Sequence, residues 1–127
     1  MNYLYVALGG ALGSVARYAV SLGAARWVGA AFPWGTLIVN VAGSFAIGLL
    51  AALVTADGRP TLGTDARAFV MIGILGGFTT FSSFSLETLN LARAGAVGAA
   101  AANAGLSLML CLAAVWLGFA AAAIVNR

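Results

Sequence analysis

Four long apolar stretches divide the sequence, at about residues 3–22, 34–55, 67–91 and 96–125. A helix that crosses the hydrocarbon core of a bilayer needs about 20 mostly apolar residues, and each stretch meets that length. Hydrophobic residues make up 63% of the chain and charged residues 7%, which leaves too few polar groups to cover a small water-soluble domain. The sequence therefore predicts an all-α integral membrane protein, with residues 1–127 forming a single domain of four transmembrane helices.

Short breaks separate these stretches. The first break covers residues 23–33, and the third is the short segment around Arg93. Residues 56–65 form the clearest loop, because they combine Pro60 with several charged residues. Asp65 closes this loop, in a place where a carboxylate can cap the amino end of the third helix.

The arginines indicate no preferred orientation in the membrane. Cytoplasmic loops usually carry an excess of lysine and arginine, but the chain has no lysine and its arginines divide equally between the two sides. Either Arg17 lies too deep to count, which leaves a weak bias, or the chain inserts in both orientations and forms an antiparallel dimer. The two sets are Arg59, Arg67 and Arg127 on one side, and Arg17, Arg26 and Arg93 on the other.

The chain lacks the residues that most enzyme sites need. It contains no histidine and a single cysteine, Cys111, which excludes histidine-based acid–base catalysis and histidine metal ligation. It has no Ser-His pair, no Cys/His cluster, no phosphate-binding loop and no basic cluster of the kind that binds nucleic acid. The protein is therefore predicted not to be an enzyme and not to bind nucleic acid.

Small residues at regular spacing mark two of the spans. Gly9 and Gly13 form a GxxxG spacing in the first span, and Gly73 and Gly77 form another in the third. Such spacing lets helix backbones approach closely in lipid. Because glycine is also common in membrane helices generally, the motif allows close packing without requiring it.

The third stretch differs from an ordinary lipid-facing helix near its middle, where Gly76 and Gly77 are followed by Thr79 and Thr80. Glycine is among the poorest helix formers, at about 1 kcal/mol relative to alanine, and hydroxyl side chains can bond backbone groups that a break sets free. We therefore expect a helix broken at mid-membrane, with carbonyl groups that suit a cation and N–H groups that suit an anion. The alternative is a continuous helix whose hydroxyls bond back to the preceding turn.

Aromatic and acidic side chains follow the expected break. Phe81 and Phe84 share a helix face because they are three residues apart. Their ring edges carry partial positive charge that can face an electron-rich species, although such a pair more commonly serves packing. Glu87 is the only carboxylate expected in or near the membrane, where it is either functional, as ionisable groups usually are, or hydrated and structural at the interface.

The other spans contribute isolated polar groups. Asn40 either bonds another helix or donates from its amide to an anion, and Thr36 lies one turn earlier on the same face. Arg17 either attracts anions into a vestibule or extends to the lipid headgroups. One weakly polar track is expected along a face of the fourth helix, and it consists of Asn103, Ser107 and Cys111.

Three segments carry a family resemblance. Residues 9–18, 35–44 and 76–87 read GGALGSVARY, GTLIVNVAGS and GGFTTFSSFSLE. They resemble the bacterial fluoride channel family called Fluc or CrcB, and the third motif is very specific. The resemblance covers the first three helices and extends to the length of the whole chain.

The resemblance implies a fluoride-selective channel in the bacterial cytoplasmic (inner) membrane. It implies an antiparallel, dual-topology homodimer, embedded in lipid, through whose two pores fluoride leaves the cytoplasm passively. It also implies a structural sodium ion at the centre of the dimer interface, held by backbone carbonyls of Gly76 and Thr79 from each subunit. The equal division of arginines agrees with dual topology.

The resemblance also implies roles for individual side chains. Similar proteins carry a hydroxyl-rich track on the fourth helix, and this chain departs from them, because the matching positions are Asn103, Ser107 and the weaker donor Cys111. The remaining roles are pore-lining rings for Phe81 and Phe84, a pore amide for Asn40, a polar lining for Ser82, Thr36 and Glu87, and a vestibule position for Arg17.

The sequence alone is also compatible with two other functions. A small four-helix drug or cation antiporter can also be a dual-topology dimer, but it needs a membrane carboxylate for proton coupling, and the first helix offers Arg17 and no acid. A non-transporting membrane subunit explains the hydrophobicity but leaves the cluster of glycine, threonine and phenylalanine without a purpose.

Overall fold

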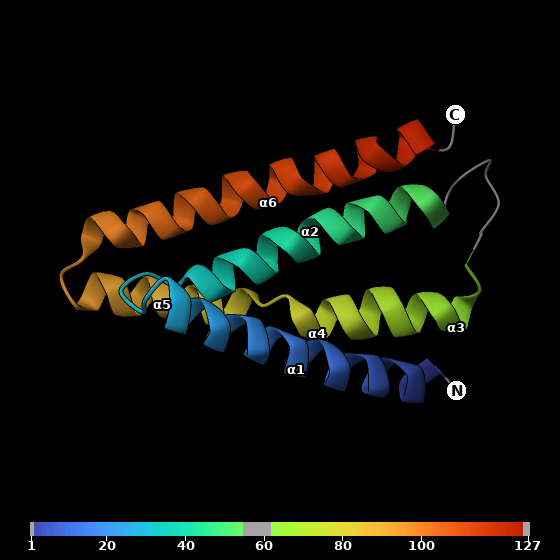
Figure 1. Ribbon diagram of the computed structural model, residues 1–127, viewed down its shortest axis with the longest axis horizontal. Coiled ribbons are helices and arrows are strands. Elements are labelled where there is room, and N and C mark those ends of the chain that lie inside the picture. Colours follow the sequence, from blue (N-terminus) through green and yellow to red (C-terminus); the bar gives the residue numbers. More distant parts are fainter. Residues whose placement is uncertain (1, 55–61, 126–127) are drawn as a thin grey trace.

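The computed structural model describes residues 2–54 and 62–125, and all regular structure in that part is helical (Figure 1). Four helical segments are long and apolar enough to cross a membrane, which confirms the predicted all-α architecture. They are Asn2–Trp27, Trp34–Val54, Thr64–Arg93 and Val97–Ile124.

The third span is assembled from several consecutive pieces, whereas the other three are single helices. It begins as α3 (Thr64–Arg67), widens into the π-helical segment η2 (Ala68–Leu75) and ends its first half as α4 (Gly76–Phe78). Its second half is α5 (Phe81–Arg93). The single helices are α1 (Asn2–Trp27), α2 (Trp34–Val54) and α6 (Val97–Val125).

Two predicted helix ends were wrong. The first helix does not end at residue 22 but continues to Trp27, because alanine and arginine in the following segment are good helix formers. Asp65 does not cap the third span, since Gly63 occupies the N-cap position without a side-chain bond and Asp65 lies within the first turn. A carboxylate there still interacts favourably with the helix dipole. Most of the loop predicted at residues 56–65 lies outside the described residues.

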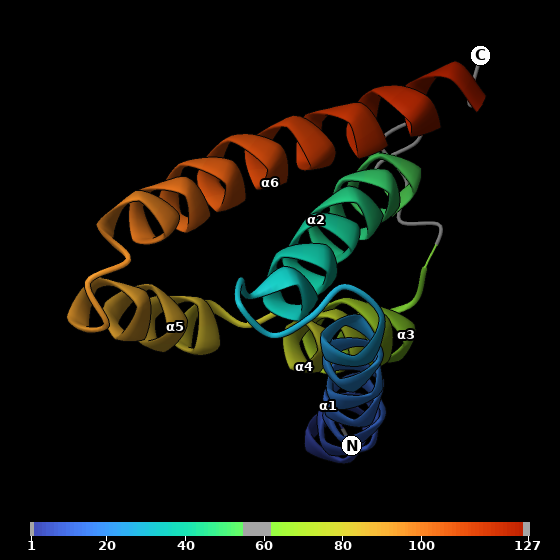
Figure 2. The same cartoon turned by 60° about the vertical axis from the view of Figure 1, so that its left-hand side comes forward.

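The helices pack in two pairs. Figures 1 and 2 show α2 lying along α6, and α1 lying along η2 and α4. Glycines make the second pair unusually close: a Cβ atom on Gly9 would overlap the carbonyl oxygen of Phe69, and one on Gly13 would overlap that of Ile74. Backbones in direct contact gain dispersion energy that helices in lipid otherwise lack. Both GxxxG motifs therefore serve packing between α1 and the third span.

The third span is broken after the glycine pair. Gly76 and Gly77 remain helical in α4, and the chain then takes extended conformations at Thr79 (φ −83°, ψ 157°) and Thr80 (φ −154°, ψ 114°). Figure 1 shows this short extended link near the middle of the span, between α4 and α5. The alternative of a continuous helix was wrong, and the predicted break is confirmed.

Candidate functional site

The amide of Asn40 bonds the backbone at the break from the neighbouring helix α2. Its Nδ2 donates to the carbonyl oxygen of Thr80 at 3.0 Å, and its Oδ1 accepts from the N–H of Thr80 at 2.7 Å. The amide thus replaces backbone bonds that a continuous helix would have made, and these would be costly to leave unmade in lipid. An amide nitrogen has two N–H bonds, and only one of them has a partner within residues 2–54 and 62–125.

The two threonines satisfy the helix ends on either side of the break. Thr79 donates both its N–H and its hydroxyl to the carbonyl oxygen of Leu75, at 3.0 and 2.9 Å. Its methyl group occupies the place that a Cβ atom on Gly43 would take. The hydroxyl oxygen of Thr80 accepts from the N–H of Ser83 at 3.2 Å and caps α5. A helix end without internal partners is therefore stabilised on each side by a neutral hydroxyl.

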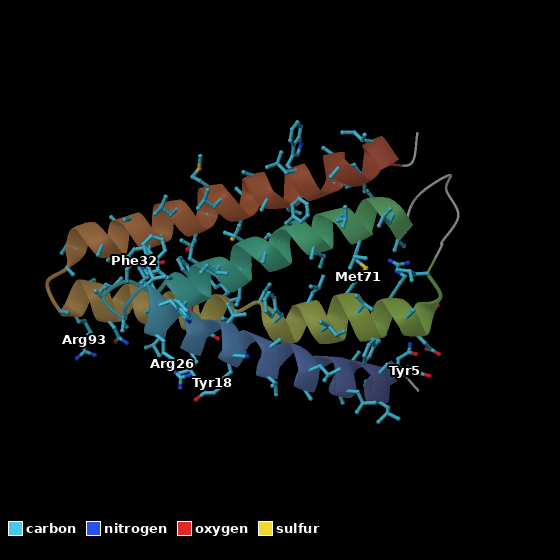
Figure 3. The ribbon with its side chains drawn as sticks, viewed as in Figure 1. Tyr5, Tyr18, Arg26, Phe32, Met71 and Arg93 are labelled. Carbon is cyan, nitrogen blue, oxygen red and sulfur yellow. The ribbon has the colours of Figure 1, made fainter. Side chains whose placement is uncertain are left out.

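A cavity of about 560 Å³ lies beside the break, between α2, η2, α5 and α6. The Phe81 and Phe84 rings form part of its wall, with centroids 5.2 Å apart and planes tilted by 48°. Met71 lies on the η2 side, and Figure 3 shows its side chain between η2 and α2. The polar groups of the wall are neutral and include Asn40, Ser44, Thr79, Thr80 and Ser107.

A second cavity, of about 360 Å³, lies further along α5, where α1 turns back into α2. Its wall includes Phe32, labelled in Figure 3, and two residues joined by a hydrogen bond. The hydroxyl of Thr36 donates to Oε1 of Glu87 at 2.9 Å, while Oε2 of Glu87 is buried without a partner among the described residues. Glu87 is thus held by α2 and faces a cavity.

The polar track of α6 divides into two environments. Ser107 and Cys111 belong to the wall of the first cavity. Asn103 is only 1% exposed and belongs to the wall of neither cavity, and its Nδ2 donates to the hydroxyl of Thr88 at 2.8 Å. The same helix face therefore supplies two cavity-lining groups and one group that bonds α5.

The structure brings most of the candidate residues to two places along α5. Ser82 and Arg17 lie outside both walls: Ser82 is exposed, with its hydroxyl 3.3 Å from that of Thr80, and Arg17 is half-buried and makes no hydrogen bond or ion pair within the described part of the chain. The wall of the first cavity includes Asn40, Phe81, Phe84, Ser107, Gly76 and Thr79, and the wall of the second includes Thr36 and Glu87.

Sequence reasoning did not single out Gly43 and Thr88. Gly43 lies one turn after Asn40, so the two residues contact Thr80 and Thr79 from the same side of α2. Thr88 lies one turn after Phe84 and bonds Asn103. The sequence held a signal for each. The amide of Asn103 needs a hydrogen-bond partner such as Thr88, and the β-branched Thr79 needs the space that Gly43 leaves.

The break also offers carbonyl groups of the kind that bind a hard cation. Gly76 and Thr79 lie at the carboxyl end of α4, where helix carbonyls lose their internal partners. Gly76 is exposed, and apart from its chain neighbours and its own helix backbone no heavy atom of the described residues lies within 4 Å of the position a Cβ atom would take. Unwound carbonyls and half-helix carboxyl ends are typical sodium ligands in membrane proteins, so the donor set fits such an ion. Residues 2–54 and 62–125 contain no cluster of three acidic, histidine or cysteine ligands.

Comparison with known proteins gives matches over nearly the whole chain. Residues 4–119 match the family described as CrcB-like protein, Camphor Resistance (CrcB). A protein of Opitutus terrae is 60% identical over 124 residues, which cover 98% of this chain and 94% of the relative. A protein of Paramagnetospirillum magneticum is 54% identical over 127 residues, covering 100% and 99%, and one of Methylocella silvestris is 52% identical over 127 residues, covering 100% and 97%. Each of these relatives is named a fluoride-specific ion channel FluC.

Proposed function

This chain belongs to the CrcB-like protein family, and on that premise we propose that it is a fluoride-selective channel that lets the ion leave the cytoplasm passively. Its relatives are named as ion channels, which confirms the prediction that the protein is not an enzyme. The observation that carries the proposal is the break at Thr79 and Thr80, which Asn40 bonds and beside which a cavity with neutral polar groups opens.

A small, strongly hydrated anion needs replacement donors at each step of its path. The free N–H of Asn40 and the ring edges of Phe81 and Phe84 supply such donors around the first cavity. The hydroxyl of Ser107 would supply another by giving up its long bond of 3.5 Å to Asn103. Among the described residues no arginine lies in the wall of either cavity, so none of their fixed cations would trap the ion there. Weak, repeated binding of this kind allows an ion both to enter and to leave.

The second cavity would continue the path towards one end of α5. Thr36 and Glu87 would form its polar lining, and Ser82 would add an exposed hydroxyl beside Thr80. The half-buried Arg17 would act from outside both walls by attracting anions to a vestibule. A multi-pass position in the bacterial inner membrane agrees with the four apolar helices and with the bacterial relatives.

The functional unit we propose is an antiparallel homodimer with dual topology, two pores and a central structural sodium ion. In support, Phe81 is 78% exposed in a single chain, and none of the residues of α5 is buried. A ring needed in a pore wall would be enclosed by a second copy. The carbonyls of Gly76 and Thr79 from both breaks would hold the sodium ion. These ligands are neutral backbone groups, so they would add no charge beside the pore.

The proposal is tested by fluoride release from liposomes, followed with a fluoride-selective electrode. Purified protein should release fluoride rapidly without a proton gradient and should release little chloride. Release that requires a proton gradient would indicate an antiporter, and no release from monodisperse reconstituted protein would indicate a non-transporting subunit.

The role of the aromatic pair is tested in the same assay. The double change Phe81→Ala and Phe84→Ala should lower fluoride flux by roughly tenfold or more, because two ring edges are lost from one wall. Phe119→Ala is the matched control, since Phe119 is 52% exposed on α6 and lies outside both cavity walls. Equal flux from the double variant and the control would remove the rings from the pore.

A further inference from the structure

Asn103 has surroundings unlike those of the other polar residues of α6. It is 1% exposed, and its amide lies between α6 and α5 rather than at a cavity. Its Nδ2 donates to Oγ1 of Thr88 at 2.8 Å, and its Oδ1 accepts a long bond of 3.5 Å from Ser107. An amide this deeply buried loses its interaction with water, so its bonds must have a structural consequence.

The bond to Thr88 continues to the backbone of a pore residue. The hydroxyl of Thr88 accepts from Asn103 and donates to the carbonyl oxygen of Phe84 at 2.7 Å. A hydroxyl that accepts and donates at once strengthens both bonds. Phe84 in turn carries one of the two rings in the wall of the first cavity. A path of two hydrogen bonds thus connects α6 to Phe84 without passing through the cavity.

Helix α5 depends on such polar links for its position. None of its residues from Phe81 to Arg93 is buried within the chain, so apolar burial holds its rotation about its own axis only weakly. Side-chain bonds from α2 hold it at Thr80 and Glu87. Within the described residues the bond from Asn103 to Thr88 is the one side-chain hydrogen bond between α5 and α6.

We propose that Asn103 is a positioning residue, which acts through Thr88 to hold α5 in the rotation that keeps the Phe84 ring in the wall of the first cavity. The proposal rests on the channel function proposed above. It assigns Asn103 a different role from the pore-lining one that the family resemblance implies, because Asn103 is 1% exposed, lies in the wall of neither cavity and donates to Thr88.

Single-channel recording in planar bilayers tests the proposal, because it separates the current through one pore from the number of active channels. Asn103→Leu removes the donor at similar volume, and Thr88→Val removes the hydroxyl with little change of shape. Each change should lower the unitary fluoride current by roughly threefold to tenfold, with dimer content by size-exclusion chromatography unchanged. The double variant should fall no further than either single variant, because both remove the same link.

Met109→Leu is the control, since Met109 is 67% exposed on α6 and outside both cavity walls; its unitary current should equal that of the parent. A conducting parent with unchanged unitary current in both single variants would overturn the proposal, even if fewer channels were active, because that pattern indicates a purely structural role. Falls that multiply in the double variant would also overturn it. A parent without fluoride current would overturn the channel function and this inference together.

Discussion

The two halves of the third span are held by different kinds of contact. The first half, from Thr64 to Phe78, lies against α1 with glycines at the closest points and buries Ala68, Gly73 and Leu75. The second half, α5, buries no residue from Phe81 to Arg93 and is held by side-chain hydrogen bonds from α2 and α6. Figure 2 shows the halves separated, with α4 beside α1 and α5 at the far side of the extended link.

This difference assigns the halves different tasks. Direct backbone contact with α1 leaves no room for an ion on that face of the first half, so this half serves as a rigid support. A helix held by hydrogen bonds keeps its remaining faces available to an ion, to lipid or to a second copy of the chain. The break at Thr79 and Thr80 allows one membrane span to combine a tightly packed half with a half held by hydrogen bonds.

The largest effect is expected on folding, when a large side chain is placed between α1 and the first half of the third span. Gly13→Leu would place its Cβ atom on the carbonyl oxygen of Ile74 and 2.8 Å from the N–H nitrogen of Phe78, so α1 would have to separate from the third span. Overpacking costs about 1–3 kcal/mol or more even where side chains can adjust, and backbone atoms cannot. We expect little or no monodisperse protein by size-exclusion chromatography.

Gly10→Ala is the control for that change, because the nearest atom to its Cβ position outside its own helix is the carbonyl oxygen of Gly73 at 4.0 Å. This variant should purify like the parent. Normal yield and thermal stability for Gly13→Leu would show that the packed half is not rigid and would remove the contrast between the two halves.

The next effect is expected at the junction between the halves. Asn40→Ala removes both bonds to the backbone of Thr80, each worth about 0.5–1.5 kcal/mol, and also removes the free amide donor. Fluoride flux from liposomes should fall between about tenfold and 100-fold, while the glycine-packed half keeps the protein folded. Asn40→Asp keeps only the acceptor for the N–H of Thr80, because a carboxylate loses both the bond to the Thr80 carbonyl oxygen and the free donor, so its flux should fall as well. Unchanged flux in Asn40→Ala would contradict a role in the pore.

Much of the fold could be predicted from the sequence because its main features are local. Apolar length is a property of a continuous stretch, so four spans were expected and found. The coincidence of two glycines with Thr79 and Thr80 indicated the break. The end of α1 was missed because residues 23–27 are compatible with both helix and interface, and the π-helical winding of η2 has no signature in hydropathy.

The bonding within the candidate site could not be predicted in the same way. Asn40 and Asn103 were recognised as amides that need partners, but their partners, Thr80 and Thr88, depend on which helices lie side by side and in what register. Thr36 and Glu87 were both candidates, and the bond between them joins residues 51 positions apart. A single sequence contains the groups but not the helix register that pairs them.

A smaller effect, on dimer stability, is expected at Gly76, which lies at the end of the packed half and is exposed in a single chain. Gly76→Ala and Gly98→Ala both introduce a methyl group where, apart from the chain neighbours and the backbone of the same helix, no described atom lies within 4 Å. Each change should favour its helix by up to about 1 kcal/mol. If a partner subunit meets Gly76, only Gly76→Ala should weaken the dimer, by about tenfold in the dissociation constant measured by dilution in detergent micelles. Equal dimer stability in the two variants would place Gly76 outside the interface.

The smallest effect is expected at the hydrogen bond that holds α5 near its middle. Thr36→Val keeps the shape of the side chain but removes the hydroxyl that donates to Oε1 of Glu87. Hydrogen bonds between helices in membranes contribute about 0.6 kcal/mol on average, so fluoride flux should fall by roughly twofold to threefold. Thr36→Ser retains the donor and should keep the parent flux, which separates the bond from the packing of the methyl group. A fall as large as that of Asn40→Ala would mean that α5 is held mainly at Glu87 and that the break is not its principal anchor.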